Sequence, residues 1–342
     1  MIMELQRICT DDQTLIDAFA ESRIGGRSEN QDSFGWKNTR LGYLVTVCDG
    51  MGGGPCGKTA SSIAVNTIIA GVEEGSQNDD VAIIIKKTVE KANKAIFDAG
   101  NSQPSLKGMG STATLLLVSE KSAFIAHVGD SRVYQLRGKK KVFRTFDHSM
   151  VFDMVSQGLL TEEQARLSAH SNVITRALGI KQDVKVDVVE VAYEKGDRFL
   201  LCSDGIHGAL PEKKLVKMAT RKKIGLDVLV SGIADYVDHE GNVLGGGHDN
   251  LTIAVVETKS SSIRKPVRSA GGKKKMIILL SALLGISLTF NIIQLCNSIN
   301  KTLDYKVKKG KTTEQSELQK TIDYETIKNW PRRDSLRYSD IQ

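Results

Sequence analysis

Cysteine is scarce in this chain of 342 residues: there are five, an odd number, and no two of them form a Cys-x-x-Cys pair. A disulfide framework is therefore not indicated. Cys48 and Cys202 lie inside apolar runs, so we expect small core residues in a reducing compartment. Residues 1–26 contain no apolar stretch that resembles a signal peptide. We therefore expect the domain that follows to remain in the cytoplasm.

Excess positive charge is missing from most of the chain, although the net charge of the whole is +7. Residues 1–257 carry 30 Lys and Arg against 33 Asp and Glu, a net charge of −3, whereas residues 258–275 contribute +7 and residues 297–342 contribute +3. A nucleic-acid-binding domain usually presents a basic face. The composition therefore argues against nucleic acid as a partner.

Charged residues are absent from "MIILLSALLGISLTFNIIQL", residues 276–295. Twenty helical residues span about 30 Å, the thickness of the hydrocarbon core of a bilayer. A buried core helix is the alternative, but a polar linker and the run Lys273, Lys274 and Lys275 precede this stretch. We predict one transmembrane helix over residues 276–296.

These segments predict the organisation and topology of the chain. A folded domain covers residues 1–257, a basic linker covers 258–275, and a polar tail covers 297–342 after the helix. Six basic residues lie in 261–275 and five in 297–311, so charge alone does not orient the helix. Because no signal peptide is found, we expect a single-pass protein of the cell membrane whose folded domain is cytoplasmic and whose helix contacts lipid.

Short segments rich in β-branched and apolar residues predict strands within the folded domain. Strands joined by short turns, with helices grouped between them, favour an α+β sandwich of antiparallel sheets over alternating βαβ units. Thr161 and Gln164 can form a capping box at the start of one helix. The predicted strands are 41–49, 111–120, 122–137, 186–193, 197–204 and 250–258, and the helical patterns are 57–74, 79–99, 149–157, 161–168 and 212–238.

Aspartate recurs where the apolar runs end. Asp49, Asp130 and Asp204 end such runs, and Asp249 stands just before one. A single Asp-Gly pair is most often a hairpin turn. Four carboxylates from distant segments can instead converge at one edge of a sandwich, where cations must offset their mutual repulsion. Oxygen ligands of this kind suit Mg²⁺ or Mn²⁺.

A phosphate-binding loop is a competing interpretation of the glycine-rich stretch after Asp49. Gly52 and the triplet Gly57-Lys58-Thr59 satisfy the spacing of such a loop, between a predicted strand and a predicted helix. This interpretation leaves the other strand-end carboxylates unexplained. Gly50, which lacks a Cβ, would instead allow a sharp turn and leave its carbonyl free to bind a metal.

Eight blocks occur in the order "GGRSENQDSFG", "VCDGMGGG", "GMGSTATLLL", "AHVGDSRVYQLR", "DHSMV", "SNVITRALG", "GDRFLLCSDG" and "GGHDNLTIAVV". With these blocks, residues 20–257 resemble the metal-dependent 2C-type (PPM) Ser/Thr protein phosphatases in their bacterial form. The resemblance implies a four-layer αββα sandwich of two antiparallel sheets flanked by helices.

The resemblance also implies a set of metal ligands. Asp49 would bridge two Mn²⁺ or Mg²⁺ ions, and the carbonyl of Gly50 would be a further ligand. Asp204 and Asp249 would complete the two sites, and Asp32 would hold a metal through water.

Two further residues match functional positions of the family, and three depart from its pattern. Asp130 matches a residue that helps to bind a third, weaker metal ion. Arg27 matches the arginine that grips the substrate phosphate, a task that suits a planar guanidinium. Met51 replaces the histidine of animal members, so the leaving group must be protonated by water or another group. Gly54 and His207 also differ from common bacterial members, which leaves substrate preference open.

The implied reaction is hydrolysis of phosphoserine and phosphothreonine in proteins by a water shared between two metal ions about 3.5–4 Å apart. No covalent intermediate is needed, and none of the five cysteines lies in a Cys-x5-Arg loop. We expect a membrane-anchored signalling phosphatase whose phosphoprotein substrates are made by a Ser/Thr kinase. A catalytically inactive binding or sensor module of the same fold and a nucleotide binder remain the alternatives.

Three histidines and one connecting segment also allow predictions. His127, His148 and His248 each stand alone, without His-x3-His spacing, so we expect structural roles for them and no zinc site. Residues 150–172 match the position of the family's mobile flap and are expected to border the active site.

Overall fold

The computed structural model describes residues 5–8, 15–53 and 55–262. Within these residues, no helix combines the length and the apolar character that crossing a bilayer requires. The predicted transmembrane helix at 276–296 and the predicted tail at 297–342 lie outside the described residues, as does most of the predicted linker.

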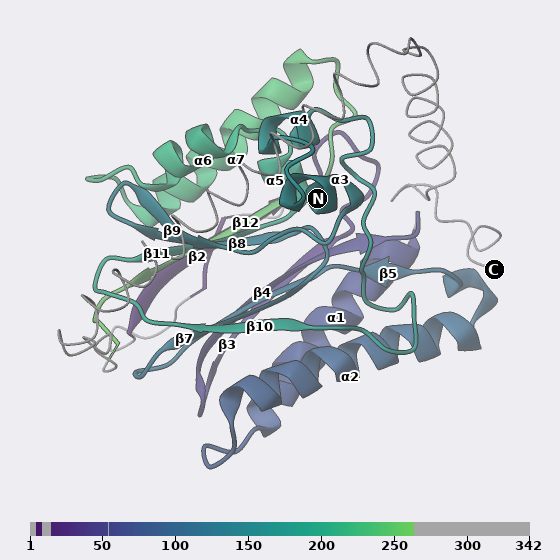
Figure 1. Cartoon of the computed structure of the whole chain (residues 1–342), viewed down its shortest axis with the longest axis horizontal. Coiled ribbons are helices and arrows are strands. Elements are labelled where there is room, and N and C mark those ends of the chain that lie inside the picture. Colours follow the sequence, from purple (N-terminus) through teal and green to yellow (C-terminus); the bar gives the residue numbers. More distant parts are fainter. Residues whose placement is uncertain (1–4, 9–14, 54, 263–342) are drawn as a thin grey trace, which may run out of the picture. The chain divides into compact units, whose positions relative to one another are not determined.

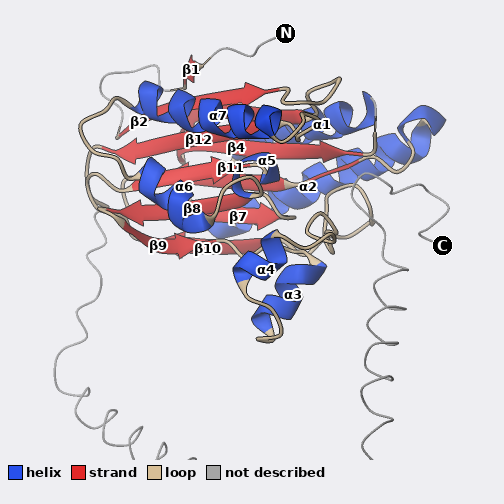
Figure 2. Cartoon of the chain, turned by 90° about the horizontal axis from the view of Figure 1, so that it is seen from above, coloured by secondary structure: helices blue, strands red, loops and turns tan. Residues whose placement is uncertain are grey.

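Two antiparallel sheets form the centre of the domain, as Figure 2 shows from above. In the first sheet the strand order is β1-β2-β12-β11-β8-β9, and in the second it is β10-β7-β6-β4-β3, with β5 paired to the end of β4. The first sheet contains β1 (Gln6–Arg7), β2 (Ile16–Arg23), β8 (Arg132–Arg137), β9 (Lys140–Arg144), β11 (Arg198–Cys202) and β12 (Leu251–Thr258). The second contains β3 (Asp32–Thr39), β4 (Gly42–Met51), β5 (Gly110–Ser111), β6 (Ala113–Val118), β7 (Ala123–Val128) and β10 (Asp187–Val191).

Helices cover the outer faces of both sheets (Figure 1). The second sheet is covered by α1 (Pro55–Glu74) and α2 (Val81–Ser102), and the first by α6 (Glu212–Ala219) and α7 (Leu226–Val243). The short elements are η1 (Pro104–Leu106), α3 (Met150–Ser156), α4 (Glu162–Arg166) and α5 (Asp204–His207). Two antiparallel sheets with flanking helices are thus confirmed.

The central strands are apolar on both faces because each face is covered. In β6, Leu115 and Leu117 pack toward α1 and α2, whereas Leu116 and Val118 pack between the two sheets. A two-sided strand of this kind appears in the sequence as a continuous apolar run. Among the described residues, three large apolar clusters lie between the two sheets and beneath the helices on each outer face.

Two predicted segments were wrong in their extent. The strand predicted at 122–137 is two strands, β7 and β8, which belong to different sheets, and the chain crosses between them at Gly129, where φ is +101°. The helix predicted at 212–238 is divided into α6 and α7, with Lys223 in the left-handed region at φ +65° between them. Backbone of this conformation cannot continue a right-handed helix.

The predicted capping box is confirmed at the start of α4. The hydroxyl of Thr161 accepts a hydrogen bond from the backbone N–H of Gln164, and the Gln164 side chain accepts one from the backbone N–H of Thr161. This reciprocal pair satisfies two backbone donors at the start of the helix.

We predict that Leu116→Ala lowers the free energy of unfolding by about 2–5 kcal/mol, because Leu116 is fully buried between the sheets and its loss leaves a cavity. Urea unfolding followed by circular dichroism measures the change. Val142→Ala, at a side chain that is 51% exposed, is the control and should change stability by less than about 0.5 kcal/mol. A loss below about 1 kcal/mol for Leu116→Ala would show that the two sheets do not pack closely there.

Candidate active site

The two central carboxylates stand opposite each other on neighbouring strands. Asp32 at the start of β3 is the antiparallel partner of Asp49 near the end of β4. Both are buried, Asp32 completely. The backbone of Asp49 is fixed by Thr112, whose hydroxyl accepts from the Asp49 N–H (2.9 Å) and whose own N–H donates to the Asp49 carbonyl (2.8 Å).

The first sheet contributes two more carboxylates at the same end of the sandwich. Asp204 begins α5 directly after β11, and Asp249 stands just before β12. These strands are antiparallel neighbours, with Cys202 opposite Ile253, so the end of one lies beside the start of the other. The hydroxyl of Ser203 donates to Oδ2 of Asp32 (2.8 Å) and thereby joins the two sheets at the site.

Burial and neighbouring negative charges disfavour the ionised form of Asp32. Its pKa is raised to about 6, first by burial and then by the charges of Asp204 and Asp249, while the hydroxyls of Thr252 and Ser203 oppose the rise. Its second oxygen, Oδ1, is buried without a hydrogen-bond partner among the described residues. A buried carboxylate with an unsatisfied oxygen beside further carboxylates suits a divalent cation or its water shell.

Gly50 is required by close backbone packing. A Cβ at this position would lie 1.9 Å from the carbonyl oxygen of Gly57 and 2.7 Å from that of Gln31. The N–H of Gly50 donates to the same Gln31 carbonyl (3.2 Å). No side chain can be accommodated here, so the close packing beside Asp49 depends on glycine. The sharp turn expected at Gly50 was wrong, because Gly50 continues strand β4 and pairs with Ser111 of β5.

The predicted site residues line two cavities that share a wall. The first, about 380 Å³, is lined by Asp130, Asp204, Asp249 and Arg27, among others. The second, about 260 Å³, is lined by Asp49, Gly50, Met51, Asp249 and Arg27. Since Arg27 and Asp249 border both cavities, all these residues belong to one site.

Arg27 lies at the rim of this site and not inside it. Its Nη2 donates to Oδ2 of Asp249 at 3.1 Å, and its side chain is 37% exposed. The contact places a guanidinium, which has five N–H donors, next to a predicted metal ligand. A phosphate group that enters the site would meet this cation.

Asn250 was missed by the sequence analysis, although it follows Asp249 directly. Its Nδ2 donates to the carbonyls of Ile24 (2.7 Å) and Glu29 (2.9 Å), and its Oδ1 accepts from the N–H of Gln31 (2.9 Å). One buried side chain therefore fastens the loop that carries Arg27 to the start of β12. An amide with all these bonds made inside the protein is a signal that only the three-dimensional structure reveals.

Arg132 is a second residue that the sequence analysis missed. It forms a buried, two-pronged ion pair with Asp147, with Nε–Oδ1 and Nη2–Oδ2 distances of 2.7 and 2.6 Å. Both residues line the larger cavity. Nearby, His207 is buried, and Nε2 of its ring bonds the carbonyl of Asp130 at 2.9 Å. Burial, and then the charge of Arg132, lowers the pKa of His207 to about 4, so it is a neutral structural group at pH 7.

The structure gives no support to the phosphate-loop interpretation. Nζ of Lys58 donates to the backbone carbonyl of Asp32 (2.6 Å) and to Oγ of Ser33 (3.0 Å). The lysine of a phosphate-binding loop must point into the loop, whereas this one is bound to β3.

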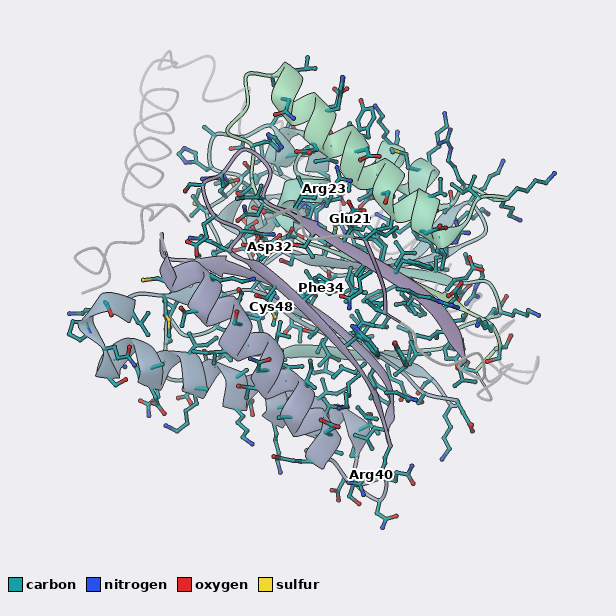
Figure 3. The ribbon with its side chains drawn as sticks, turned by 180° about the vertical axis from the view of Figure 1, so that it is seen from behind. Glu21, Arg23, Asp32, Phe34, Arg40 and Cys48 are labelled. Atoms are coloured by element: carbon teal, nitrogen blue, oxygen red, sulfur yellow. The ribbon has the colours of Figure 1, made fainter. Side chains whose placement is uncertain are left out.

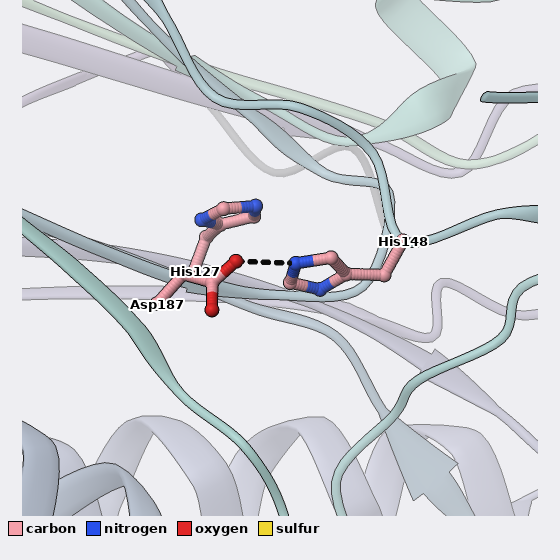
Figure 4. A group of neighbouring side chains, drawn as sticks. All are labelled: His127, His148 and Asp187. Carbon is pink, nitrogen blue, oxygen red and sulfur yellow. Dashed lines mark hydrogen bonds and ion pairs between the residues drawn. The ribbon is translucent and has the colours of Figure 1, made fainter. Parts of the chain in front are cut away.

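Two of the three histidines meet in the structure. His127, His148 and Asp187 offer donor atoms that all lie within 4.8 Å of one another, and the imidazole rings stack with centroids 4.4 Å apart (Figure 4). Nδ1 of His148 accepts the N–H of Gly129 (3.1 Å), so neutral His148 carries its proton on Nε2 and directs it at Asp187 (2.9 Å). A metal on Nε2 would need that proton moved to Nδ1, against the Gly129 N–H.

A fixed positive charge beside His148 and Asp187 also disfavours the binding of a metal cation there. Nη1 of Arg176 lies 2.9 Å from Nε2 of His148 and 3.3 Å from a carboxylate oxygen of Asp187. The remaining histidine, His248, bonds Asp238 at 2.8 Å. These contacts support the structural roles expected for the three histidines.

Comparison with known proteins agrees with this geometry. Residues 21–225 match the model of the family described as protein phosphatase 2C. The chain belongs to the protein phosphatase 2C family. It is a protein serine/threonine phosphatase, and dependence on metal ions is general in this family.

Bacterial relatives cover the domain almost from end to end. The serine/threonine phosphatase stp of Listeria innocua is 32% identical over 235 residues, which are 68% of this chain and 91% of that protein. The phosphatase PhpP of Streptococcus pneumoniae is also 32% identical, over 67% of this chain and 92% of its own length. Relatives of this 2C-type domain are thus little longer than the matched segment.

Solved structures agree in fold. The serine/threonine phosphatase of S. agalactiae superposes with a TM-score of 0.64 at 30% identity, over 71% of this chain and 99% of its own. The catalytic domain of the phosphatase PstP, solved in complex with two manganese ions, superposes with a TM-score of 0.59 at 28% identity, over 71% of this chain and 97% of its own. These solved chains, which this chain covers almost completely, fold without a further domain, and we expect the same of residues 1–262.

We predict that acid destabilises this phosphatase partly through His148. Burial, and then the neighbouring His127, lowers its pKa to about 4, while an unfolded histidine titrates near 6.5. The stabilisation is therefore complete above pH 6.5 and is lost as the pH falls toward 4, because the unfolded chain takes up the proton first. In His148→Asn, whose amide oxygen can still accept from Gly129, the slope of unfolding free energy against pH should be lower by up to about 1.4 kcal/mol per pH unit.

Urea unfolding between pH 4 and 7 measures this slope. His239→Asn is the matched control, because the His239 side chain is 74% exposed, and its slope should equal that of the unmodified protein. Equal slopes in His148→Asn and the unmodified protein would mean that His148 takes up its proton at the same pH in the folded and the unfolded state.

Proposed function

We propose that this 2C-type phosphatase hydrolyses phosphoserine and phosphothreonine in proteins with two Mg²⁺ or Mn²⁺ ions at the carboxylate site, and with a third, weaker ion near Asp130. One observation carries the proposal: Asp49 from one sheet and Asp204 and Asp249 from the other line adjoining cavities around the buried Asp32. The full oxygen donor set argues against an inactive binding module of the same fold.

Each carboxylate has a role in this proposal. Asp49, with the carbonyl of Gly50, would bind both ions, and Asp204 and Asp249 would complete their coordination. Asp32 would act through water. The bound ions supply a nucleophilic water at neutral pH and offset the charge of the phosphate dianion.

Arg27 would orient the phosphate of the substrate. The guanidinium already lies beside Asp249, and a phosphate in the site offers it a pair of oxygens in fork geometry. Asn250 holds the loop of Arg27 in place. Met51 has no proton to donate, so a solvent water protonates the leaving alkoxide in this proposal.

We predict that Asp49→Asn reduces the rate of phosphopeptide hydrolysis by at least about 1,000-fold in Mn²⁺, because it removes charge from both metal sites at once. Phosphate release from a phosphothreonine peptide measures the rate, and isothermal titration calorimetry measures Mn²⁺ binding, which should also weaken. EDTA should abolish the activity of the unmodified enzyme.

Asp98→Asn, on the exposed surface of α2, is the control and should retain full activity. Asp49→Asn with nearly full activity in Mn²⁺ would overturn the assignment of Asp49 as the shared ligand.

We also propose that residues 276–296 anchor the enzyme in the cell membrane as a single helix, with the catalytic domain in the cytoplasm. The uncharged run of twenty residues and the basic segment before it support the anchor. Phosphoproteins made by a cytoplasmic Ser/Thr kinase would then be its substrates.

Proteolysis of intact cells tests this orientation. A protease added outside should shorten the full chain by the length of residues 297–342 and leave the catalytic domain intact. Permeabilised cells, in which the protease reaches both sides, are the control. Digestion of the catalytic domain in intact cells would reverse the orientation.

A further inference from the structure

The first sheet has two ends with different properties. At one end, Cys202 of β11 stands opposite Arg132 and Ile253, and the active-site carboxylates Asp204 and Asp249 lie just beyond. At the other end, Arg198 of β11 stands opposite Leu136 and Glu257. Figure 3 shows the same separation in the second sheet, where Asp32 and Arg40 lie at opposite ends of the β3–β4 hairpin. We call the end away from the carboxylates the distal end.

Three chain segments come together at the distal end of the first sheet. Arg198 donates through Nη1 to the carbonyls of Ala219 (2.9 Å) and Arg221 (2.8 Å), which holds the α6–α7 connection beside β11. The N–H of Lys195 donates to Oγ of Ser261 (3.0 Å), next to the point where the described chain ends. The turn between β8 and β9 completes the group, since Leu136 is the partner of Arg198.

These segments carry a group of exposed basic side chains, which we call the distal basic surface. None of its members forms an ion pair within the described residues. It consists of Lys139, Lys140, Lys195, Arg221, Lys222, Lys223 and Lys259.

Three of the acidic side chains among them, Glu194, Asp197 and Glu257, are held in ion pairs with two arginines. Arg137 pairs with Glu194 (2.8 Å) and Asp197 (2.7 Å), and Arg198 pairs with Glu257 (2.6 Å). The seven basic residues are therefore a local excess of positive charge on a domain whose sequence is slightly acidic in total.

One of these residues occupies a backbone conformation that favours glycine. Lys223 has φ of +65°, and it is the one non-glycine residue with positive φ within the described ranges. A side chain with a Cβ is disfavoured there, so keeping a lysine costs conformational energy that glycine would avoid. A role for the positive charge of Lys223 would explain why lysine, and not glycine, occupies this position.

The point where the chain leaves the described domain indicates the kind of partner that this surface binds. Ser262, the last described residue, donates its N–H to the carbonyl of Tyr193 (3.0 Å) near the distal basic surface. Only 13 residues, with a reach of at most about 45 Å, separate it from the apolar run that begins at Met276. The distal end is thus the end that a membrane anchor would hold nearest the bilayer.

We propose that the distal basic surface binds the anionic headgroups of the membrane, so that the active site faces away from the bilayer. This inference rests on the proposed anchor at 276–296. Each basic residue near an anionic membrane strengthens binding by about fivefold, and the attraction falls within a Debye length, so several residues on one surface are needed.

Vesicle co-sedimentation of the catalytic domain, residues 1–262, tests the proposal without the anchor. The domain should bind vesicles that contain 30% phosphatidylglycerol at least about 100-fold more strongly than pure phosphatidylcholine vesicles, and added salt should weaken the binding. The fourfold variant K139E/K140E/K222E/K223E should lose at least about 100-fold of that binding. The matched control K86E/K87E/K91E/K94E makes the same charge change on α2 and should stay within about threefold of the unmodified domain.

A single substitution gives an independent readout. Lys223→Gly should raise thermal stability, because it relieves the left-handed backbone, and should weaken binding to the anionic vesicles by about fivefold. Weaker lipid binding together with higher stability excludes loss of folding as the cause.

Three results would overturn the proposal: equal binding to both kinds of vesicle, an equal loss in the α2 control, or undiminished binding by the fourfold variant. The first result is the one expected if the surface served an acidic protein partner instead. The anchor is tested separately, because full-length enzyme released from membranes by alkaline carbonate would disprove the anchor whatever the vesicle result. A different combination is a full-length enzyme that stays in the membrane after carbonate treatment and an isolated domain that binds both kinds of vesicle equally. That combination would support the anchor and disprove only the lipid-binding surface.

Discussion

The repulsion among buried carboxylates at one end of the sandwich is the constraint on which the rest of the active site depends. Asp32 cannot reach water, and its neighbours Asp204 and Asp249 come from the opposite sheet. Two rigid layers hold these charges together, because the apolar core between the sheets stabilises the arrangement that the charges oppose. A divalent cation removes the conflict, which is why this architecture favours metal-assisted chemistry over a nucleophilic side chain.

The sequence predicted that aspartates at strand ends would converge at one edge of the sandwich, and the structure brings Asp49, Asp204 and Asp249 to one end for a physical reason. Aspartates that follow long apolar runs are conspicuous, and the runs are long because β4, β6 and β7 are covered on both faces. Strands with mixed polarity were harder to find: β2, β3 and β9 were not predicted, since polar and charged side chains interrupt their apolar pattern. Continuity of apolar character also joined β7 to β8, because nothing in the side chains marks the crossing between sheets at Gly129.

Residues that act by holding others in place escaped prediction. Asn250 and Arg132 take part through hydrogen bonds to segments more than ten residues away, and a spacing rule contains no information about such partners. His127 and His148 also show what a spacing rule misses. Each stands alone in sequence, yet their rings stack, and only the hydrogen bond from Gly129 reveals which nitrogen carries the proton.

The bonds of Asn250 have a consequence for how this enzyme can change over evolutionary time. One amide couples the loop of Arg27 to the strand that follows Asp249, so the residue proposed to bind phosphate and a residue proposed to bind metal are fastened to each other. The helices α3 and α4 belong to a different segment, which borders the larger cavity through Phe152 and Arg166. If Arg27 and Asp249 act as proposed, mutations in the α3–α4 segment are expected to change which phosphoproteins fit without moving either residue, so substrate preference can evolve separately from the reaction itself.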